Sequence, residues 1–149
     1  MLTNVDANAR LVNALERLVY GSVGITTLAI AQTSEAAELT FAQWRVLVML
    51  GDGPRRVGEI AGRLAISITS ASRLVRRMEN KGYVDTARDE RDRRATLVTL
   101  SDKGARTRAG VTLHRRALID NLVRDGASAL PGDLNAGLEV LAERFLRYV

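Results

Sequence analysis

Residues 57–82 have the sequence VGEIAGRLAISITSASRLVRRMENKG, and the spacing of the apolar side chains in this stretch decides the fold. Two sets of these side chains recur every three or four residues, as they do along one face of a helix: Val57, Ile60, Ala61 and Leu64, then Ala71, Leu74, Val75 and Met78. We therefore predict a short helix over the first set and a second helix from about Ile68 to Asn80. Ser67 is a suitable N-cap for the second helix, and Gly82 lies just beyond its end, where glycine commonly terminates helices. Two such helices joined by a tight turn form a helix-turn-helix.

A hairpin is predicted directly after these two helices. Residues 83–88 and 95–100 have the length and the content of β-branched and aromatic residues that favour strands. The charged run DERDRR (89–94) joins them. A hairpin that follows a helix-turn-helix defines the winged form of the motif.

Further helices are predicted on both sides of this motif. They cover about residues 7–32, 41–50, 101–125 and 134–148, and Thr40 is a suitable N-cap for the helix that ends at the turn 51–54. We predict a mainly α fold with a small β-hairpin wing. In this interpretation residues 1–149 form a single domain, with a winged helix-turn-helix lobe at about residues 39–104.

The positive charge of the chain is concentrated in the predicted lobe. The whole chain of 149 residues has a net charge of +5, whereas residues 55–108 hold 14 basic and 7 acidic residues, a net charge of +7. The remaining residues hold 8 basic and 10 acidic residues, a net charge of −2. A basic segment of this kind indicates a polyanionic partner, although a solvated charged surface has the same composition.

The composition excludes several kinds of site. The absence of cysteine excludes disulfides, thiol redox sensing and thiolate metal ligands. The single histidine, His114, cannot form a transition-metal site by itself, and we expect it on the surface of the long helix. The sequence offers no nucleophile–base pair and no glycine-rich phosphate loop, so we predict neither an enzyme nor a bound metal or cofactor.

The N-terminal region gives an expectation about location. It lacks the basic start of a secretory signal, and its most apolar stretch, residues 18–31, is shorter than a bilayer span requires. We therefore expect a soluble, cytoplasmic protein that does not enter the membrane.

The second helix of the motif has a polar face opposite its apolar side chains. Hydroxyl groups lie near the start of this face, and arginines follow at about one-turn spacing. The major groove of DNA admits a helix, arginine can donate two hydrogen bonds to guanine, and serine or threonine can contact bases or phosphates. The predicted DNA-binding residues of this helix and its N-cap are Ser67, Thr69, Ser70, Ser72, Arg73, Arg76 and Arg77. An ordinary amphipathic helix with a solvated basic face is the alternative. The arginines in the hairpin turn favour DNA, since arginine gains from the negative potential of a narrow minor groove.

Several runs of this sequence resemble the MarR family of bacterial transcriptional regulators. They are LTFAQWRVL (39–47), VGEIAGRLA (57–65), SASRLVRRMENKGYV (70–84) and DRRATLVTLSDKG (92–104). The most specific part is an Asp-x-Arg wing motif followed by an apolar strand that ends in Leu-Ser-x-x-Gly. It is formed here by Asp92, Arg94, Leu100, Ser101 and Gly104. The flanking helices resemble the family in length and placement only.

The resemblance implies a homodimer and assigns roles to the wing. The dimerisation helices would be those at about residues 7–32 and 105–149, and the two recognition helices would lie about 34 Å apart and bind an inverted repeat. The resemblance places Arg94 in the minor groove of double-stranded DNA, with Asp92 orienting its side chain. Arg91 and Arg93 would contact phosphates.

The resemblance also implies a repressor that leaves a specific operator when it binds a small aromatic or phenolic effector. The candidate effector-binding residues are Phe41, Trp44 and Arg45, with His114 more remote, although Trp44 equally suits the core. The predicted function is therefore that of a sequence-specific, ligand-responsive transcriptional regulator. A winged-helix protein-interaction module without ligand control is the alternative. Its weakness is the number of exposed arginines, because protein interfaces exclude charge from their centres.

Overall fold

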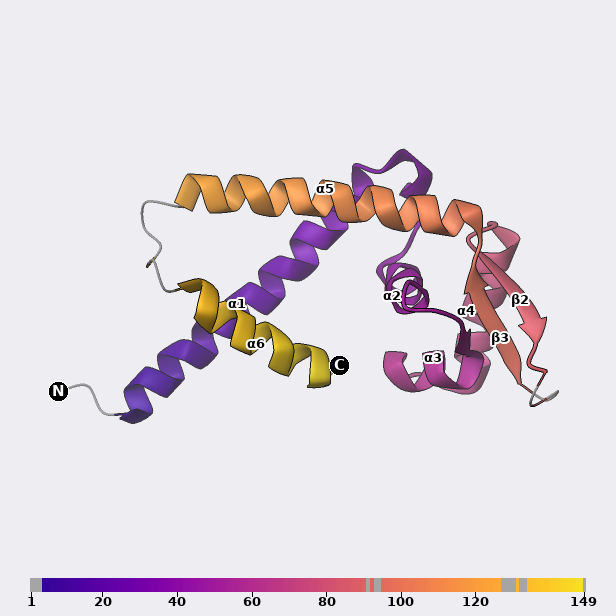
Figure 1. The fold of residues 1–149 in the computed structure, drawn as a ribbon, viewed down its shortest axis with the longest axis horizontal. Helices are drawn as coiled ribbons and strands as arrows, with labels where there is room; N and C mark the ends of the chain where they lie inside the picture. The colour runs from indigo at the N-terminus through magenta and orange to yellow at the C-terminus, as the bar shows by residue number, and fades with distance from the viewer. Residues whose placement is uncertain (1–3, 91, 93–94, 127–130, 132–133, 149) are drawn as a thin grey trace.

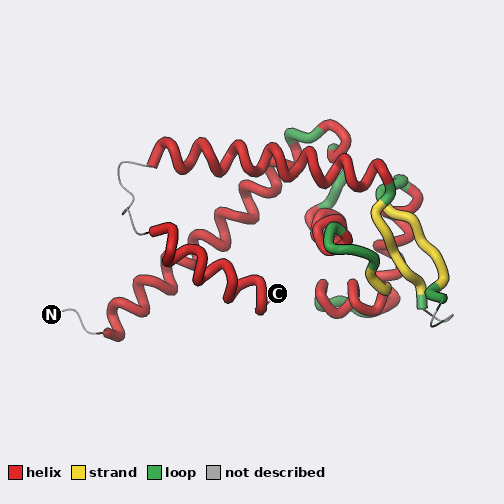
Figure 2. Tube along the Cα trace, in the orientation of Figure 1, coloured by secondary structure: helices red, strands yellow, loops and turns green. Residues whose placement is uncertain are grey.

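Helices make up most of the chain, and a small sheet lies at one end of it (Figures 1 and 2). The computed structural model describes residues 4–90, 92, 95–126, 131 and 134–148. The helices are α1 (Asn4–Ala31), α2 (Phe41–Leu50), α3 (Val57–Leu64), α4 (Ile68–Asn80), α5 (Asp102–Gly126) and α6 (Leu134–Tyr148), with a short 3-10 helix η1 (Ser34–Ala36). The strands are β1 (Arg55–Arg56), β2 (Val84–Arg88) and β3 (Thr96–Leu100). The predicted fold class, mainly α with a small β wing, is confirmed.

The core of the lobe lies where α2, α3 and α4 pack against the sheet and the first half of α5. Its fully buried side chains include Val46, Leu47, Ile60, Met78, Val84, Val98 and Val111. The buried members of α3 and α4 are the apolar side chains whose spacing predicted these helices. Burial of these faces therefore fixes which sides of α3 and α4 remain exposed to solvent.

α4 begins and ends at the predicted residues because a local sequence signal marks each end of the helix. The Ser67 side chain accepts a hydrogen bond from the Ser70 amide at 3.1 Å, as an N-cap does. At the other end Gly82 has φ of +72°, a conformation that favours glycine. The Tyr83 amide donates to the Met78 carbonyl at 2.9 Å, which closes the last turn of the helix.

The sheet contains one strand more than the predicted hairpin. Its order is β1-β3-β2, and both pairings are antiparallel. The two predicted strands, 83–88 and 95–100, are confirmed as β2 and β3, each of which begins one residue later than predicted. β1 was missed because it has only two residues, and its partner on β3 lies about forty positions away, with Arg55 opposite Val98 and Arg56 opposite Leu97.

The outer helices are long and present apolar side chains to solvent. α5 extends from the sheet to the far end of the molecule, and α1 packs against it (Figure 1). Leu18 on α1, Leu122 on α5 and Phe145 on α6 are exposed. Among the described side chains of α6, none is buried.

The expectation for the apolar N-terminal stretch needs correction. Gly21 and Gly24 do not interrupt α1, so a segment of 24 residues, Asn8–Ala31, is long and apolar enough to cross a membrane by length and composition alone. Only 17% of its most apolar window is buried within the chain. The predicted stretch was too short because it began at residue 18, whereas the apolar part of the helix begins at Asn8.

Gly104 lies where α5 meets the backbone of Tyr83, and we predict that this position tolerates no side chain. A Cβ atom at Gly104 would lie 1.9 Å from the Tyr83 carbonyl oxygen and 3.0 Å from its carbonyl carbon. Gly104→Ala should therefore lower the free energy of unfolding by about 3 kcal/mol, the upper part of the range for overpacking. Urea unfolding at a fixed protein concentration measures this loss.

Gly62→Ala is the matched control for this substitution. Gly62 lies within α3, and a Cβ there would meet nothing within 4 Å. The control should raise the free energy of unfolding by roughly 0.5–1 kcal/mol, because alanine favours a helix over glycine. Equal stability of Gly104→Ala and the wild-type protein would contradict the role of this contact.

Candidate nucleic-acid interface

The exposed face of α4 carries the residues predicted to bind DNA. Ala71, Leu74, Val75 and Met78 point into the core, with at most 6% of each exposed. The opposite face presents all seven predicted residues of this helix and its cap to solvent: Ser67, Thr69, Ser70, Ser72, Arg73, Arg76 and Arg77. The structure therefore brings this set together on one surface.

The hydroxyl groups at the start of α4 differ in their partners. The Ser67 hydroxyl donates to the Ser70 hydroxyl at 2.9 Å, in addition to capping the Ser70 amide. The Ser72 hydroxyl donates to the Ile68 carbonyl one turn back at 2.9 Å. Ser67 and Ser72 thus already bond to their own helix, so Thr69 and Ser70 are the better placed hydroxyls for an external acceptor.

The three arginines of α4 line two adjoining hollows on the surface. One hollow is formed by Ser70, Arg73, Arg76 and Arg77. The other lies between α4 and the wing and is lined in part by Arg73, Arg76, Thr86 and Thr96. Within the described part of the chain, none of the three arginines forms an ion pair. Their charges are therefore available to an anionic partner.

The wing is held to the helix-turn-helix by two side-chain contacts. The Thr86 hydroxyl on β2 donates to the Glu79 carboxylate on α4. At the end of β2, the Asp89 carboxylate accepts from Arg56, with the same oxygen 2.7 Å from Nε and 2.6 Å from Nη2. Asp89, the first residue of the charged run that was predicted to join the strands, is kept buried by this ion pair, with 8% exposed.

The predicted wing residues are only partly covered by the structure. Arg91, Arg93 and Arg94 lie outside the described residues, so their assigned roles stay predictions. Asp92 is exposed, and its carbonyl accepts from the Ala95 amide at 2.8 Å. The pairing of Asp92 with Arg94 likewise stays a prediction.

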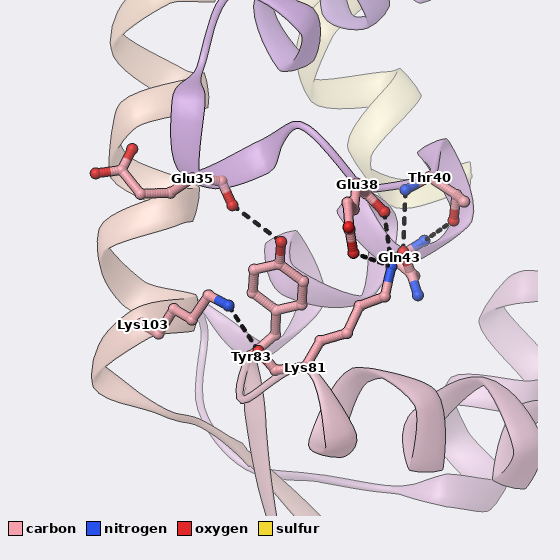
Figure 3. Close-up of polar contacts among 7 residues, drawn as sticks. All are labelled: Glu35, Glu38, Thr40, Gln43, Lys81, Tyr83 and Lys103. Atoms are coloured by element: carbon pink, nitrogen blue, oxygen red, sulfur yellow. Dashed lines mark hydrogen bonds and ion pairs between the residues drawn. The ribbon is translucent and has the colours of Figure 1, made fainter.

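A junction of polar contacts joins α4, the wing and α5 (Figure 3). The Tyr83 hydroxyl donates to the Glu35 carbonyl at 2.9 Å, and Lys103 donates to the Lys81 carbonyl at 2.7 Å. Lys81 binds Glu38 through both the carbonyl (3.0 Å) and the carboxylate (3.2 Å) of that residue. Burial raises the pKa of the Tyr83 phenol further above neutral pH, so this phenol stays a hydrogen-bond donor. Sequence reasoning missed this junction because its partners are distant along the chain.

The candidate effector-binding residues do not share one open site. Trp44 is 3% exposed and belongs to the core, with the Arg115 guanidinium 5.7 Å from the centre of its ring. Arg45 donates to the Arg63 carbonyl at 2.8 Å, so α2 is tied to the end of α3. Phe41 alone among the three is exposed, at 40%.

His114 is not the surface residue that was expected. It is half-buried on α5, and its Nδ1 lies 2.8 Å from the hydroxyl oxygen of buried Thr33. Because that hydroxyl donates to the Ala29 carbonyl at 2.8 Å, His114 Nδ1 is the donor in this pair. The expectation failed because Thr33, at the end of α1, is far from His114 in sequence. No group of three residues that could hold a metal ion occurs in the described part of the chain.

A basic exposed helix whose opposite face is buried, beside a three-stranded antiparallel sheet, defines a winged helix-turn-helix protein. Residues 37–95 match the model of the MarR family. BadR of Rhodopseudomonas palustris, a transcriptional activatory protein, is 35% identical over 66% of this chain and 59% of its own length. TtmR of Methylorubrum extorquens, an HTH-type transcriptional regulator, is 36% identical over 64% of this chain and 57% of its own length.

The similarity to a solved structure extends over nearly the whole chain. The crystal structure of RV1404 from Mycobacterium tuberculosis has a TM-score of 0.77 and 28% identity, covering 97% of this chain and 95% of that one. These comparisons support a MarR family winged-helix regulator, with the family model matching residues 37–95 alone. The chain spans about three-fifths of the length of the curated relatives described above. Both of these relatives are transcriptional regulators rather than enzymes, in line with the expectation for this chain.

The two serines that bond within α4 give a test of how the recognition surface is held. Ser67→Ala removes the N-cap acceptor and should lower the free energy of unfolding by about 1 kcal/mol. Ser72→Ala is the control, because its hydroxyl only bonds back to Ile68 and alanine is the better helix former. It should leave stability unchanged or slightly raised in urea unfolding. Equal losses for both variants would refute the capping role of Ser67.

Proposed function

We propose that this chain regulates transcription by binding double-stranded DNA with α4 in the major groove. The observation that carries the proposal is the exposed face of α4, where Arg73, Arg76 and Arg77 adjoin one another without an ion pair among the described residues. Thr69 and Ser70 lie at the start of that face, where a recognition helix meets base edges. The wing beside α4 supplies the second contact, in the minor groove, through Arg94.

The proposal includes a homodimer that binds an inverted repeat. Its support is the apolar surface that the outer helices leave exposed, including Leu11, Leu18, Leu122 and Phe145. A large exposed apolar surface marks an interaction site in a water-soluble protein. A second copy of the chain covers this surface by two-fold symmetry, and it also explains why α1 is apolar enough to span a membrane. We place the protein in the cytoplasm, where its DNA is.

Repression and release by a small effector are the finer parts of the proposal. A dimer bound across an operator represses by occupancy alone, whereas activation requires an additional contact with the transcription machinery. BadR is named an activatory protein. In our proposal, the position of the operator decides whether a bound dimer represses or activates transcription. Exposed Phe41 is the best placed of the three candidate residues to meet an aromatic effector, since Trp44 and Arg45 are engaged within the lobe.

A protein-interaction module is the competing function, and DNA affinity separates the two. We expect the full chain to enrich a duplex of about 30 bp, room for two half-sites one turn apart, from a random-sequence library. Affinity for this duplex should fall steeply with salt, because each neutralised phosphate releases counterions. Arg73→Ala should cost about 1–3 kcal/mol of binding free energy by fluorescence anisotropy.

The matched control is Arg116→Ala, an exposed arginine on α5 away from the recognition face. It should leave DNA affinity unchanged within about twofold, as for a charge outside the contact surface. No enriched duplex, or affinity that does not depend on salt, would reject DNA binding in favour of a protein partner.

A further inference from the structure

Arg56 immediately precedes α3, where a helix usually has a short polar N-cap. An arginine side chain has no hydrogen-bond acceptor, so it cannot cap the first amides of α3. The reciprocal contact of a capping box is present instead, since the Glu59 carboxylate accepts from the Arg56 amide at 2.9 Å. The guanidinium of Arg56 is therefore free of any capping role and extends toward the wing.

The partner of this guanidinium is Asp89, a buried residue that directly follows β2. The Asp89 carboxylate lies 2.7 Å from Arg56 Nε and 2.6 Å from Nη2. The Asp89 side chain is 11% exposed and that of Arg56 is 43% exposed. A carboxylate with so little access to water is stabilised by such a charged partner.

Asp89 also fixes the base of the wing turn through its backbone. Its amide donates to the Ala95 carbonyl at 3.0 Å, and the Ala95 amide donates to the Asp92 carbonyl at 2.8 Å. Asp89 and Ala95 therefore lie side by side, directly after β2 and directly before β3. Asp89 therefore makes two connections: its amide bonds to Ala95 next to β3, and its carboxylate bonds to Arg56 at the start of α3.

We infer that Arg56 is a positioning residue for DNA binding: through Asp89 it sets the wing at a fixed place relative to α4. The inference rests on the proposed function. β1 has only two residues, so its backbone pairing with β3 is a short connection between the helix-turn-helix and the wing. The Arg56–Asp89 ion pair adds a second connection, next to the other outer strand, β2. Loss of the pair leaves α4 and the Thr86–Glu79 contact in place, but it frees the end of the wing that follows β2 from the start of α3.

Three variants separate positioning from direct contact. Arg56→Gln removes the charge, Asp89→Asn breaks the ion pair but leaves the charge of Arg56, and the third variant combines the two. On the duplex enriched by the wild-type protein, we expect each single variant to lose about tenfold in affinity, as for one good contact. The double variant should lose no more than either single variant, because the two residues act as one unit. Arg63→Gln, an exposed arginine at the other end of α3, is the control and should bind as the wild type does.

Footprinting distinguishes a displaced wing from general destabilisation. Hydroxyl-radical protection of the flanking minor grooves should be lost in all three variants, while protection of central guanine N7 atoms from methylation persists. An affinity loss in Arg56→Gln without one in Asp89→Asn would overturn the inference and make Arg56 a direct phosphate contact. Equal loss of both kinds of protection, or no loss of affinity, would overturn it as well. Failure of the wild-type protein to enrich any duplex would instead refute the proposed function, and the inference with it.

Discussion

The backbone of Tyr83 lies so close to α5 that position 104 has room only for glycine. This close approach joins the end of α4, the beginning of β2 and the first turn of α5 at one point. The Ser101 hydroxyl donates to the Gly82 carbonyl and accepts from the Gly104 amide, so the start of α5 is capped by the same contact. The orientation of the recognition surface therefore depends on where α5 lies.

This dependence gives a mechanical connection between the outer helices and the recognition helix. α5 continues from the junction away from the sheet, and the C-terminal part of α1 packs against the middle of α5 (Figure 1). The contacts of Tyr83 and Lys81 with η1 and the residues after it add a second connection from the same turn (Figure 3). A change in how the outer helices pack would move α4 and the wing together. The Arg56–Asp89 pair then matters for a different reason, since it keeps the wing fixed relative to α4 during such a movement.

The sequence predicted what depends on neighbouring residues and missed what depends on distant ones. α4 was predicted to its terminal residues because Ser67 and Gly82 act within one turn of its ends. The recognition face followed directly, since the buried side of the helix fixes the exposed one. The burial of Asp89 could not be predicted, because its partner is 33 positions away and a run of six charged residues usually indicates solvent exposure. The same reason explains the error for His114, whose partner Thr33 is 81 positions away.

The central claim is that two copies of this chain place their α4 helices in successive major grooves on one face of DNA. A crystal structure of the protein with its enriched duplex measures the separation of the two Arg73 Cα atoms. The account predicts one two-fold dimer per inverted repeat and a separation of about 34 Å, one turn of the double helix. A single copy bound to the duplex, or a separation that does not match the helical repeat, would contradict it.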